Sequence, residues 1–366
     1  MSDNEKYTIV LDVMGADHGP EIIIDGGLMA ARNLGSRLHV ILVGDKEQID
    51  KHLSTVETIP DNISVEHASS VVPMHISATE GVRMRDSSIV IGLKQLKEKK
   101  AHGFVSPGNT GAVMATSLLT LGRIEDVSRP AITAVFPTAT GKPAVVLDVG
   151  ANADCKPQHL SQFAVMGSVY YSILFKRDFP RVGLLSIGEE RSKGNELIFE
   201  AQKKLKDSKI NFVGNVEGRD ILSGDIDVAI TDGFTGNILL KFAESIKPLL
   251  VSSFQRQIQT NMFSRMGVML LLPFLRRMRN LFDYAEAGGA PLLGVGGNVM
   301  ICHGSSNSRA ISNAVIAAHK MSEEKIKDKI HDELMRNHFG KSNETENKSK
   351  DNRDRVVCAS ATNDQR

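Results

Sequence analysis

The chain repeats one pattern, in which a short apolar run is followed by a glycine-containing polar turn and then by a stretch of helical periodicity. Such runs occupy residues 7–14, 144–149, 182–187, 226–231 and 299–303. Strands that alternate with helices in this way form βαβ units with right-handed crossovers. The sequence therefore predicts an α/β fold, with a mostly parallel sheet and helices on both of its faces.

Other stretches extend this pattern. We expect further strands at 39–44 and 64–68, because both are short and rich in β-branched residues. Apolar side chains at helical spacing predict one amphipathic helix over 79–99. Residues 131–136 and 144–149 flank a Thr-Gly-Lys turn. This pair predicts a hairpin or an excursion at the edge of the sheet.

Composition narrows the class of protein. With 366 residues, of which 41% are hydrophobic, the chain can bury a large core as one α/β unit or as two packed lobes. A net charge of +1 gives no reason to expect a nucleic-acid partner. The three cysteines lack Cys-x-x-Cys spacing, which argues against a disulfide framework and a structural zinc site. A reducing cytosol fits this cysteine usage best.

The two ends of the chain are polar. The first six residues lack the charge and hydrophobicity pattern of a signal peptide, and no apolar run has the ~18 residues that a spanning helix needs. Beyond residue 339 large apolar residues almost disappear, which predicts a disordered tail. We therefore expect a single two-lobed catalytic domain over 1–338 and a polar tail over 339–366, in a cytoplasmic protein.

Polar side chains are concentrated in the turns that follow the strands. In a parallel sheet these turns lie at one edge, outside the carboxyl ends of the strands, where ligands bind. Nearby glycines let backbone N–H groups approach a ligand, and helix N-termini favour anions, so phosphate is the expected ligand. The candidate binding residues are Asp12, Gly15, Asp17, His18, Ser106, Gly108, Asn109, Thr110, Asp148, Asn152, Asp154, Glu189, Arg191, Lys193, Asp232, Gly233, Thr235, Asn237, His303 and Ser305.

Several cofactor classes are disfavoured by missing motifs. The chain contains neither Gly-x-x-x-x-Gly-Lys-Ser/Thr nor a Gly-x-Gly-x-x-Gly after a strand, which argues against an ATPase and a standard NAD dehydrogenase. Asp12, Asp148 and Asp232 could assemble a metal site, but they show no fixed ligand spacing. Aspartate at the end of a strand is also common as a helix cap or turn former. We expect no metal and no cofactor.

Six motifs, taken together and in this order, resemble those of the bacterial phosphate acyltransferase family of phospholipid synthesis. They are DVMGADHGP at 12–20, VSPGNTGA at 105–112, GANADCKP at 150–157, IGEERSKG at 187–194, TDGFTGN at 231–237 and HGSSN at 303–307. The resemblance implies transfer of a fatty acyl group from acyl carrier protein to inorganic phosphate. The acyl phosphate formed would serve the glycerol-phosphate acyltransferase. A fold related to isocitrate dehydrogenase and phosphotransacetylase, a homodimer and peripheral association with the cytoplasmic membrane are also implied.

Lys193 and Asn237 match the positions that this family uses for catalysis. Phosphate near neutral pH is already partly a dianion, so it needs positioning more than a strong base. The thioester carbonyl develops negative charge as it is attacked, and preorganised donors lower that barrier. We expect Lys193 to neutralise phosphate and the developing oxyanion, and Asn237 to orient one of them. Arg191 and the loop amides at Asn109 and Thr110 are weaker candidates for holding phosphate, since Arg191 could equally pair with a carboxylate.

Two further side chains have rival roles. Cys155 could carry an acyl-enzyme, but no histidine stands at an obvious spacing, and a lone cysteine more often packs in the core. His18 could act as a general base or cap its turn, and both roles stay open.

The segment 260–283 departs from the alternation of strands and helices. Its arginines, Arg265, Arg276 and Arg279, fall opposite an apolar helical face, and Pro273 predicts a break into two helices. The segment could be a helix pair buried in a dimer interface or core. We favour a basic amphipathic projection, over about 254–287, that contacts an anionic membrane or the acyl chain. Its apolar face consists of Phe263, Met266, Leu270, Phe274, Met278 and Leu281.

Two other functions remain as alternatives. A phosphotransacetylase-like enzyme would keep the fold and take its acyl group from coenzyme A, but a short acyl donor has no use for the apolar projection. A membrane-docking scaffold for other proteins of lipid synthesis would need no catalysis, and the charged, glycine-flanked turns argue against that role.

Overall fold

The computed structural model describes residues 6–17, 19–258 and 288–339. In this part of the chain one sheet has 11 strands in the order β3-β2-β1-β4-β11-β10-β5-β6-β9-β7-β8. A first parallel group contains β3 (Ile63–His67), β2 (Leu38–Gly44), β1 (Tyr7–Asp12), β4 (Gly103–Ser106) and β11 (Asn298–Ile301). A second parallel group contains β6 (Ala144–Leu147), β9 (Val228–Ile230), β7 (Val182–Leu185) and β8 (Phe212–Val216).

Two strands join these groups and reverse the direction of the sheet. β10 (Ala290–Leu293) is antiparallel to both β11 and β5 (Ala131–Phe136), and β5 is antiparallel to β6. The strands of the second group therefore run opposite to those of the first. The carboxyl ends of the two groups therefore lie at opposite edges of the sheet. The prediction that all the strand-to-helix turns lie at one edge is wrong.

The predicted hairpin at 131–136 and 144–149 is confirmed, with Thr133 opposite Leu147 and Phe136 opposite Ala144. It is not an excursion at the edge, because β5 and β6 lie between β10 and β9 in the interior of the sheet. The hairpin is thus the junction between the two parallel groups.

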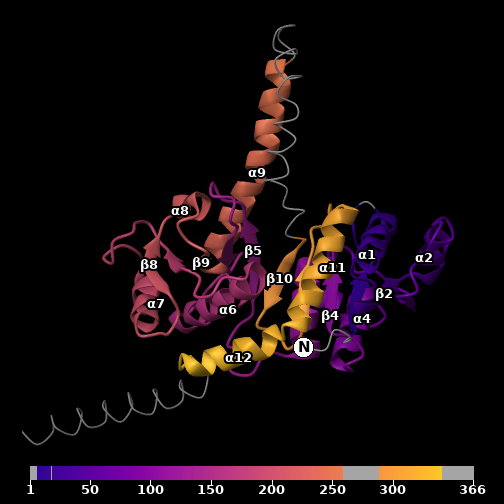
Figure 1. Cartoon of the computed structure of the whole chain (residues 1–366), viewed down its shortest axis with the longest axis horizontal. Helices are drawn as coiled ribbons and strands as arrows, with labels where there is room; N and C mark the ends of the chain where they lie inside the picture. Colours follow the sequence, from indigo (N-terminus) through magenta and orange to yellow (C-terminus); the bar gives the residue numbers. More distant parts are fainter. Residues whose placement is uncertain (1–5, 18, 259–287, 340–366) are drawn as a thin grey trace, which may run out of the picture.

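Helices cover both faces of the sheet, as predicted (Figure 1). Alternate residues of β1 show this, since Ile9 and Leu11 pack in one buried cluster and Val10 in another. The α/β class is therefore confirmed. The helices are α1 (Pro20–Leu34), α2 (Lys46–Leu53), α3 (Ala78–Arg83), α4 (Ser88–Lys97), α5 (Thr110–Leu121), α6 (Pro157–Phe175), α7 (Glu196–Lys206), α8 (Gly218–Ser223), α9 (Gly233–Ile258), α11 (Ser308–Glu323) and α12 (Ile326–Arg336), with a 3-10 turn at Gly35–Arg37.

The single helix predicted over 79–99 is instead two helices, α3 and α4. The Ser87 hydroxyl accepts a hydrogen bond from the backbone N–H of Val90 and so starts a new helix. Ser77 and Glu80 form a capping box at the start of α3. Local capping therefore overrides the continuous apolar spacing of this stretch.

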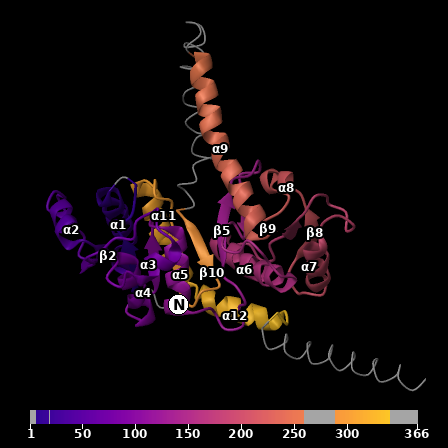
Figure 2. The ribbon, with the colours of Figure 1, turned by 180° about the vertical axis from the view of Figure 1, so that it is seen from behind.

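Helix α9 follows β9, has 26 residues, and projects away from the rest of the structure (Figures 1 and 2). The predicted amphipathic projection at 254–287 overlaps the end of α9 at 254–258. Its apolar residues Phe263, Met266, Leu270, Phe274, Met278 and Leu281 lie outside the described residues, as does the tail at 340–366. Of the helices described here, none has the length and apolar character needed to cross a membrane.

Candidate active site

The predicted binding residues form two clusters, one in each parallel group. The first cluster follows β1, β4 and β11 and contains Asp12, Gly15, Asp17, Ser106, Gly108, Asn109, Thr110, His303 and Ser305. The second cluster follows β6, β7 and β9 and contains Asp148, Asn152, Asp154, Glu189, Arg191, Lys193, Asp232, Gly233, Thr235 and Asn237. His18 lies outside the described residues.

A buried carboxyl organises the first cluster. Asp12, at the end of β1, accepts hydrogen bonds from the Ser106 hydroxyl at 2.6 Å and from the backbone N–H of Met14 at 3.0 Å. Burial raises the pKa of Asp12 to about 6, although hydrogen bonds from Ser106, Ser88 and Met14 oppose this shift. The Ser106 oxygen also accepts from the backbone N–H of Gly108 at 3.1 Å. Asp12 thus links two neighbouring turns.

Asn109 has its side chain fully engaged with the protein. Its oxygen caps α5 by accepting from the backbone N–H of Ala112 at 3.0 Å. Its amide donates to the carbonyl oxygens of Pro73, Met74 and Ile76 at 3.0–3.2 Å. The side chain therefore fixes the 73–76 loop against α5 and has no amide hydrogen to spare for phosphate.

The other turns of the first cluster lie close to one another. A Cβ on Gly15, whose φ is +79°, would lie 3.2 Å from Cα of Gly108. The backbone N–H of Asp17 donates to the carbonyl of Gly304 at 2.9 Å. Nδ1 of His303 lies 2.7 Å from the Ser305 hydroxyl. Exposed polar groups at this edge are contributed by Asp17, Thr110, His303 and Ser305.

A second buried carboxylate, Asp148, organises the second cluster. Its Oδ1 accepts from the backbone N–H groups of Ile132, Gly150 and Ala151 at 2.9–3.2 Å. Its Oδ2 accepts from the backbone N–H of Asn152 at 2.7 Å and from the Asn152 side chain at 2.8 Å. Burial raises the pKa of Asp148, and these donors oppose the shift. Five donors on one carboxylate fix the turn after β6.

The start of α9 packs directly on this turn. The backbone N–H of Gly233 donates to the carbonyl of Asn152 at 2.8 Å. At Gly236 a Cβ would lie 1.9 Å from the carbonyl oxygen of Asp148, so only glycine fits there. Asn237 follows, exposed, and its side-chain oxygen would lie 3.5 Å from a Cβ placed on Gly150. The two glycines thus allow Asn237 to lie against the 148–152 turn.

The loop after β7 presents Lys193. Its backbone N–H donates to the carbonyl of Glu190 at 2.9 Å, closing a turn. The Lys193 side chain is exposed, and its ammonium makes no ion pair with any carboxylate in the described ranges. Within the described residues no ion pair of Arg191 is found, and the neighbouring Glu189 pairs with Arg219 of α8 at 2.8 Å.

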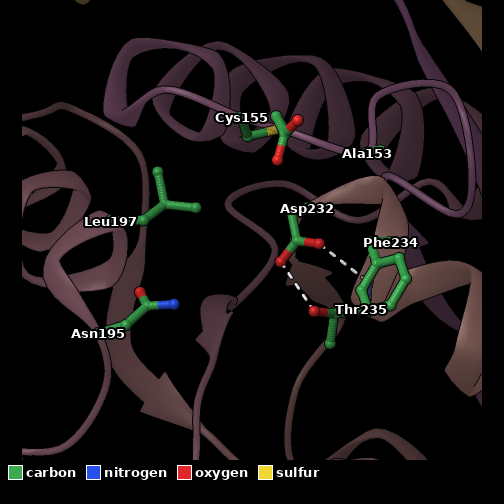
Figure 3. Close-up of a pocket in the computed structure, with 8 residues that line it drawn as sticks. Ala153, Cys155, Asn195, Leu197, Asp232, Phe234 and Thr235 are labelled. Atoms are coloured by element: carbon green, nitrogen blue, oxygen red, sulfur yellow. Dashed lines mark hydrogen bonds between the residues drawn. The ribbon is translucent and has the colours of Figure 1, made fainter.

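One open pocket lies between the start of α7 and the start of α9 (Figure 3). It has a volume of about 490 Å³. Asn195 and Leu197 lie across the space from Asp232, Phe234 and Thr235. Asp232 accepts from the backbone N–H and the hydroxyl of Thr235, both at 2.8 Å, which caps α9. Asp154 also lines the pocket, together with Ala153 and Cys155.

Cys155 is a neutral thiol in this pocket. Burial, together with the nearby charge of Asp148, raises its pKa to about 12. Its Sγ lies 3.8 Å from the carbonyl oxygen of Asn152. Only a thiolate is an effective nucleophile, so this environment does not suit an acyl-enzyme.

Sequence reasoning missed Asn215, whose side-chain amide donates to the carbonyl oxygens of Glu190 and Lys193 at 3.0 and 2.9 Å. Arg219 was missed as well. The β8 and α8 segment that carries both residues lacks a motif, so no local signal in the sequence marks them. Within the described ranges, no three or more His, Cys, Asp or Glu side chains are grouped as metal ligands would be.

Comparisons with known proteins agree with this architecture. A family model described as "Fatty acid synthesis protein" matches residues 7–329. A phosphate acyltransferase of Syntrophotalea carbinolica is 44% identical over 328 residues, covering 89% of this chain and 94% of the relative. The phosphate acyltransferase of Dictyoglomus turgidum is 44% identical over 324 residues, covering 88% and 96%.

Solved structures show a similar fold at low sequence identity. A phosphotransacetylase from Streptococcus pyogenes superposes with a TM-score of 0.61 at 17% identity, covering 87% of this chain and 94% of that one. A branched-chain phosphotransacylase from Enterococcus faecalis gives a TM-score of 0.54 at 13% identity, covering 86% and 99%. Given its extensive identity to the curated relatives, this chain is an acyltransferase and belongs to the phosphate acyltransferase family.

Proposed function

We propose that this protein transfers a fatty acyl group from acyl carrier protein to inorganic phosphate, forming acyl phosphate for phospholipid synthesis. Family membership supports the reaction class. One structural observation supports the choice of residues: the wall of a single pocket includes Asn195 and Thr235, which stand two positions from Lys193 and Asn237 respectively. Lys193 thus lies in the loop that leads into α7 and Asn237 lies near the start of α9, and these two segments border the same pocket.

Lys193 supplies the positive charge that a phosphate dianion needs. The pocket itself is lined by two acidic residues, Asp154 and Asp232. Phosphate therefore lies toward the exposed Lys193 side of the opening rather than between the carboxylates, because like charges repel strongly where water is partly excluded. Arg191, exposed on the same loop, adds to the positive potential there.

The reaction proceeds by direct attack. An unprotonated oxygen of HPO₄²⁻ forms a bond to the thioester carbonyl carbon, and the C–S bond then breaks. The hydroxyl proton of the phosphate passes to the departing thiolate, so the products are acyl phosphate and the carrier thiol. Lys193 stabilises the oxyanion of the tetrahedral intermediate, and Asn237 orients it or the phosphate. Cys155 takes no covalent part, since its thiol stays protonated near neutral pH.

The other predicted binding residues fall into two groups, those whose hydrogen-bonding groups are used within the protein and those whose groups are exposed. Asp12, Asn109 and Asn152 spend theirs on the protein, so we assign them to holding the turns in shape. Glu189 and Arg191 of the second cluster remain proposed substrate contacts. The exposed residues of the first cluster follow strands of the opposite direction, so we propose them as contacts of the carrier-protein substrate rather than of the phosphate beside Lys193; they are Asp17, Thr110, His303 and Ser305. Gly15, Gly108 and Gly233 allow the close approaches between turns.

The direct test is to incubate the purified protein with palmitoyl-acyl carrier protein and phosphate and to measure acyl phosphate. Lys193→Ala should stay folded and lose at least about 100-fold in turnover, as removal of one oxyanion donor does elsewhere. Glu200→Ala, which breaks the exposed Glu200–Lys203 ion pair on α7, is the matched control and should keep wild-type turnover. Near-normal turnover of Lys193→Ala would overturn the assignment.

A coenzyme A donor is the alternative that the structural neighbours suggest. The same assay with acetyl-coenzyme A and palmitoyl-coenzyme A in place of the carrier protein separates the two. Our proposal requires the highest kcat/KM for the acyl-carrier-protein thioester. A higher kcat/KM for either coenzyme A thioester would replace it with a phosphotransacetylase-like function.

We also propose that the protein is a homodimer that associates peripherally with the cytoplasmic membrane. The supporting observation is the projecting helix α9, on which Phe242, Leu249 and Leu250 are 67%, 63% and 51% exposed. Flotation with anionic vesicles tests the membrane part, and Leu270→Glu should reduce binding. Unchanged flotation would favour a helix pair buried between subunits. A protein that binds vesicles but forms no acyl phosphate would fit the scaffold alternative.

A further inference from the structure

The Lys193 loop is exposed, but one buried side chain forms hydrogen bonds with its backbone. Asn215, on β8, is 7% exposed. Its amide nitrogen donates to the carbonyl oxygens of Glu190 and Lys193 at 3.0 and 2.9 Å. The same turn is closed by the hydrogen bond from the Lys193 N–H to the Glu190 carbonyl. Asn215 therefore forms hydrogen bonds with both ends of the turn that carries Lys193.

Asn215 is itself fixed. Its side-chain oxygen accepts from the amide of Gln202, on α7, at 2.6 Å. This bond sets which way the Asn215 amide points, because it assigns the oxygen to Gln202 and leaves both N–H groups for the two carbonyls. A chain of side chains thus runs from α7 through β8 to the Lys193 loop.

The other attachment of the loop is weaker. Glu189 pairs with Arg219 at 2.8 Å, but these side chains are 59% and 70% exposed. Exposed ion pairs contribute little, whereas buried hydrogen bonds to backbone carbonyls are costly to lose. Space is also limited at Gly188, where a Cβ would lie 2.9 Å from Cγ of Lys193. The backbone of the loop is constrained while the lysine ammonium stays free.

We propose that Asn215 is a positioning residue of the acyltransferase site, which holds the 190–193 turn so that the Lys193 ammonium faces the phosphate. This inference rests on the proposed catalytic role of Lys193. It predicts that Asn215 acts on turnover through Lys193 and not through the stability of the fold. Misplacement of a catalytic group by about 1 Å can cost about 100-fold in rate.

The test is a double-mutant cycle between positions 215 and 193, with kcat and KM for phosphate measured with palmitoyl-acyl carrier protein. Asn215→Asp keeps the acceptor for Gln202 and removes both donors to the loop. We expect it to lower kcat/KM by about 10- to 100-fold in the wild-type background and by less than about threefold in the Lys193→Ala background. An equal loss in both backgrounds would show a role independent of Lys193 and would overturn the inference.

A second readout does not depend on catalysis. The loop contains two trypsin sites, after Arg191 and after Lys193. Asn215→Asp should speed tryptic cleavage at these sites in the native enzyme, while Glu200→Ala should not. If Asn215→Asp fails to fold, Gln202→Ala removes the donor to the Asn215 oxygen while keeping Asn215, and it should show the same non-additivity with Lys193→Ala. An equal loss in both backgrounds would again overturn the inference.

The two proposals fail in different ways. Normal turnover of Lys193→Ala defeats the proposed function whatever Asn215 does. Turnover that depends on Lys193 but is unaffected by Asn215→Asp, with tryptic cleavage unchanged, defeats the positioning role alone.

Discussion

Asp148→Asn tests whether the carboxylate at the end of β6 holds the second cluster together. In the wild type Oδ1 faces three donors, from Ile132, Gly150 and Ala151, and Oδ2 faces two donors of Asn152. Asparagine keeps the volume but replaces one acceptor oxygen with a donor. The new amide nitrogen takes the Oδ2 position at lower cost, because there it opposes two donors instead of three.

Two donors then lose their partner. Both donors belong to the half-buried Asn152. A fully buried donor left unsatisfied costs roughly 1–3 kcal/mol, so about 2–6 kcal/mol is the upper range for the loss in the free energy of unfolding. Burial of the charge offsets part of this loss, since the raised pKa of Asp148 means that its ionised form is less stable in the fold than in water. We therefore expect the lower half of the range, about 2–4 kcal/mol.

The assay is urea unfolding of wild type and variant, followed by circular dichroism and extrapolated to zero urea. Asp154→Asn changes an exposed carboxyl of the same loop and should alter the free energy of unfolding by less than about 0.5 kcal/mol. If Asp148→Asn unfolded at the same urea concentration as the wild type, the five hydrogen bonds would not be what fixes this turn.

Three further predictions concern other residues of the two clusters. Because burial raises the pKa of Asp12 from 3.8 to about 6, the native state keeps a proton that the unfolded chain has released, and stability from this group is lost as the pH rises through 6. Asp12→Asn should remove about 2–3 kcal/mol of that fall between about pH 4 and pH 7, as measured by urea unfolding at each pH. Cys155→Ala should keep turnover within about threefold, and iodoacetamide should label the wild-type thiol slowly, because its pKa is about 12; a loss of activity beyond about 100-fold would support an acyl-enzyme instead. Gly236→Ala places a Cβ against the backbone carbonyl of Asp148, so it should lower the free energy of unfolding by about 1–3 kcal/mol or more and reduce kcat. A variant as stable and active as the wild type would contradict this close packing.

Strands with their own local signal were predictable from the sequence. The runs at 39–44 and 131–136 correspond to β2 (Leu38–Gly44) and β5 (Ala131–Phe136) within a residue. Their pairing was not predictable to the same degree. The hairpin of β5 and β6 was expected at an edge, but β10 adds a strand on its other side and makes it internal.

The strand β10 shows why the sheet reversal was missed. It has only four residues, Ala290–Leu293, and follows two glycines. It pairs with β5 across a separation of 160 residues, from Ile132 to Leu292, and it is antiparallel to both neighbours. Such a short apolar run carries no local signal for whether it pairs parallel or antiparallel, because this depends on the distant strands that it joins. The two clusters of polar turns could therefore not be separated by sequence alone.

Whether a polar side chain is free to bind a substrate depends on how many of its hydrogen-bonding groups are already used inside the protein. Residue type alone does not show this. Asn109, Asn215 and Asn237 are all asparagines near a strand or a helix start. Asn109 and Asn215 are buried, and each side chain bonds to backbone or side-chain groups on both its oxygen and its nitrogen.

Asn237, by contrast, is exposed beside Gly150, and Lys193 is exposed on a turn whose backbone is already held. A side chain whose donors and acceptors are all used inside the protein can stabilise a loop but cannot gain energy from a substrate without breaking those bonds. The residues best placed to meet phosphate are therefore exposed side chains whose backbone is fixed by other groups. This is the physical basis for proposing catalysis by Lys193 and Asn237 and positioning by Asn215.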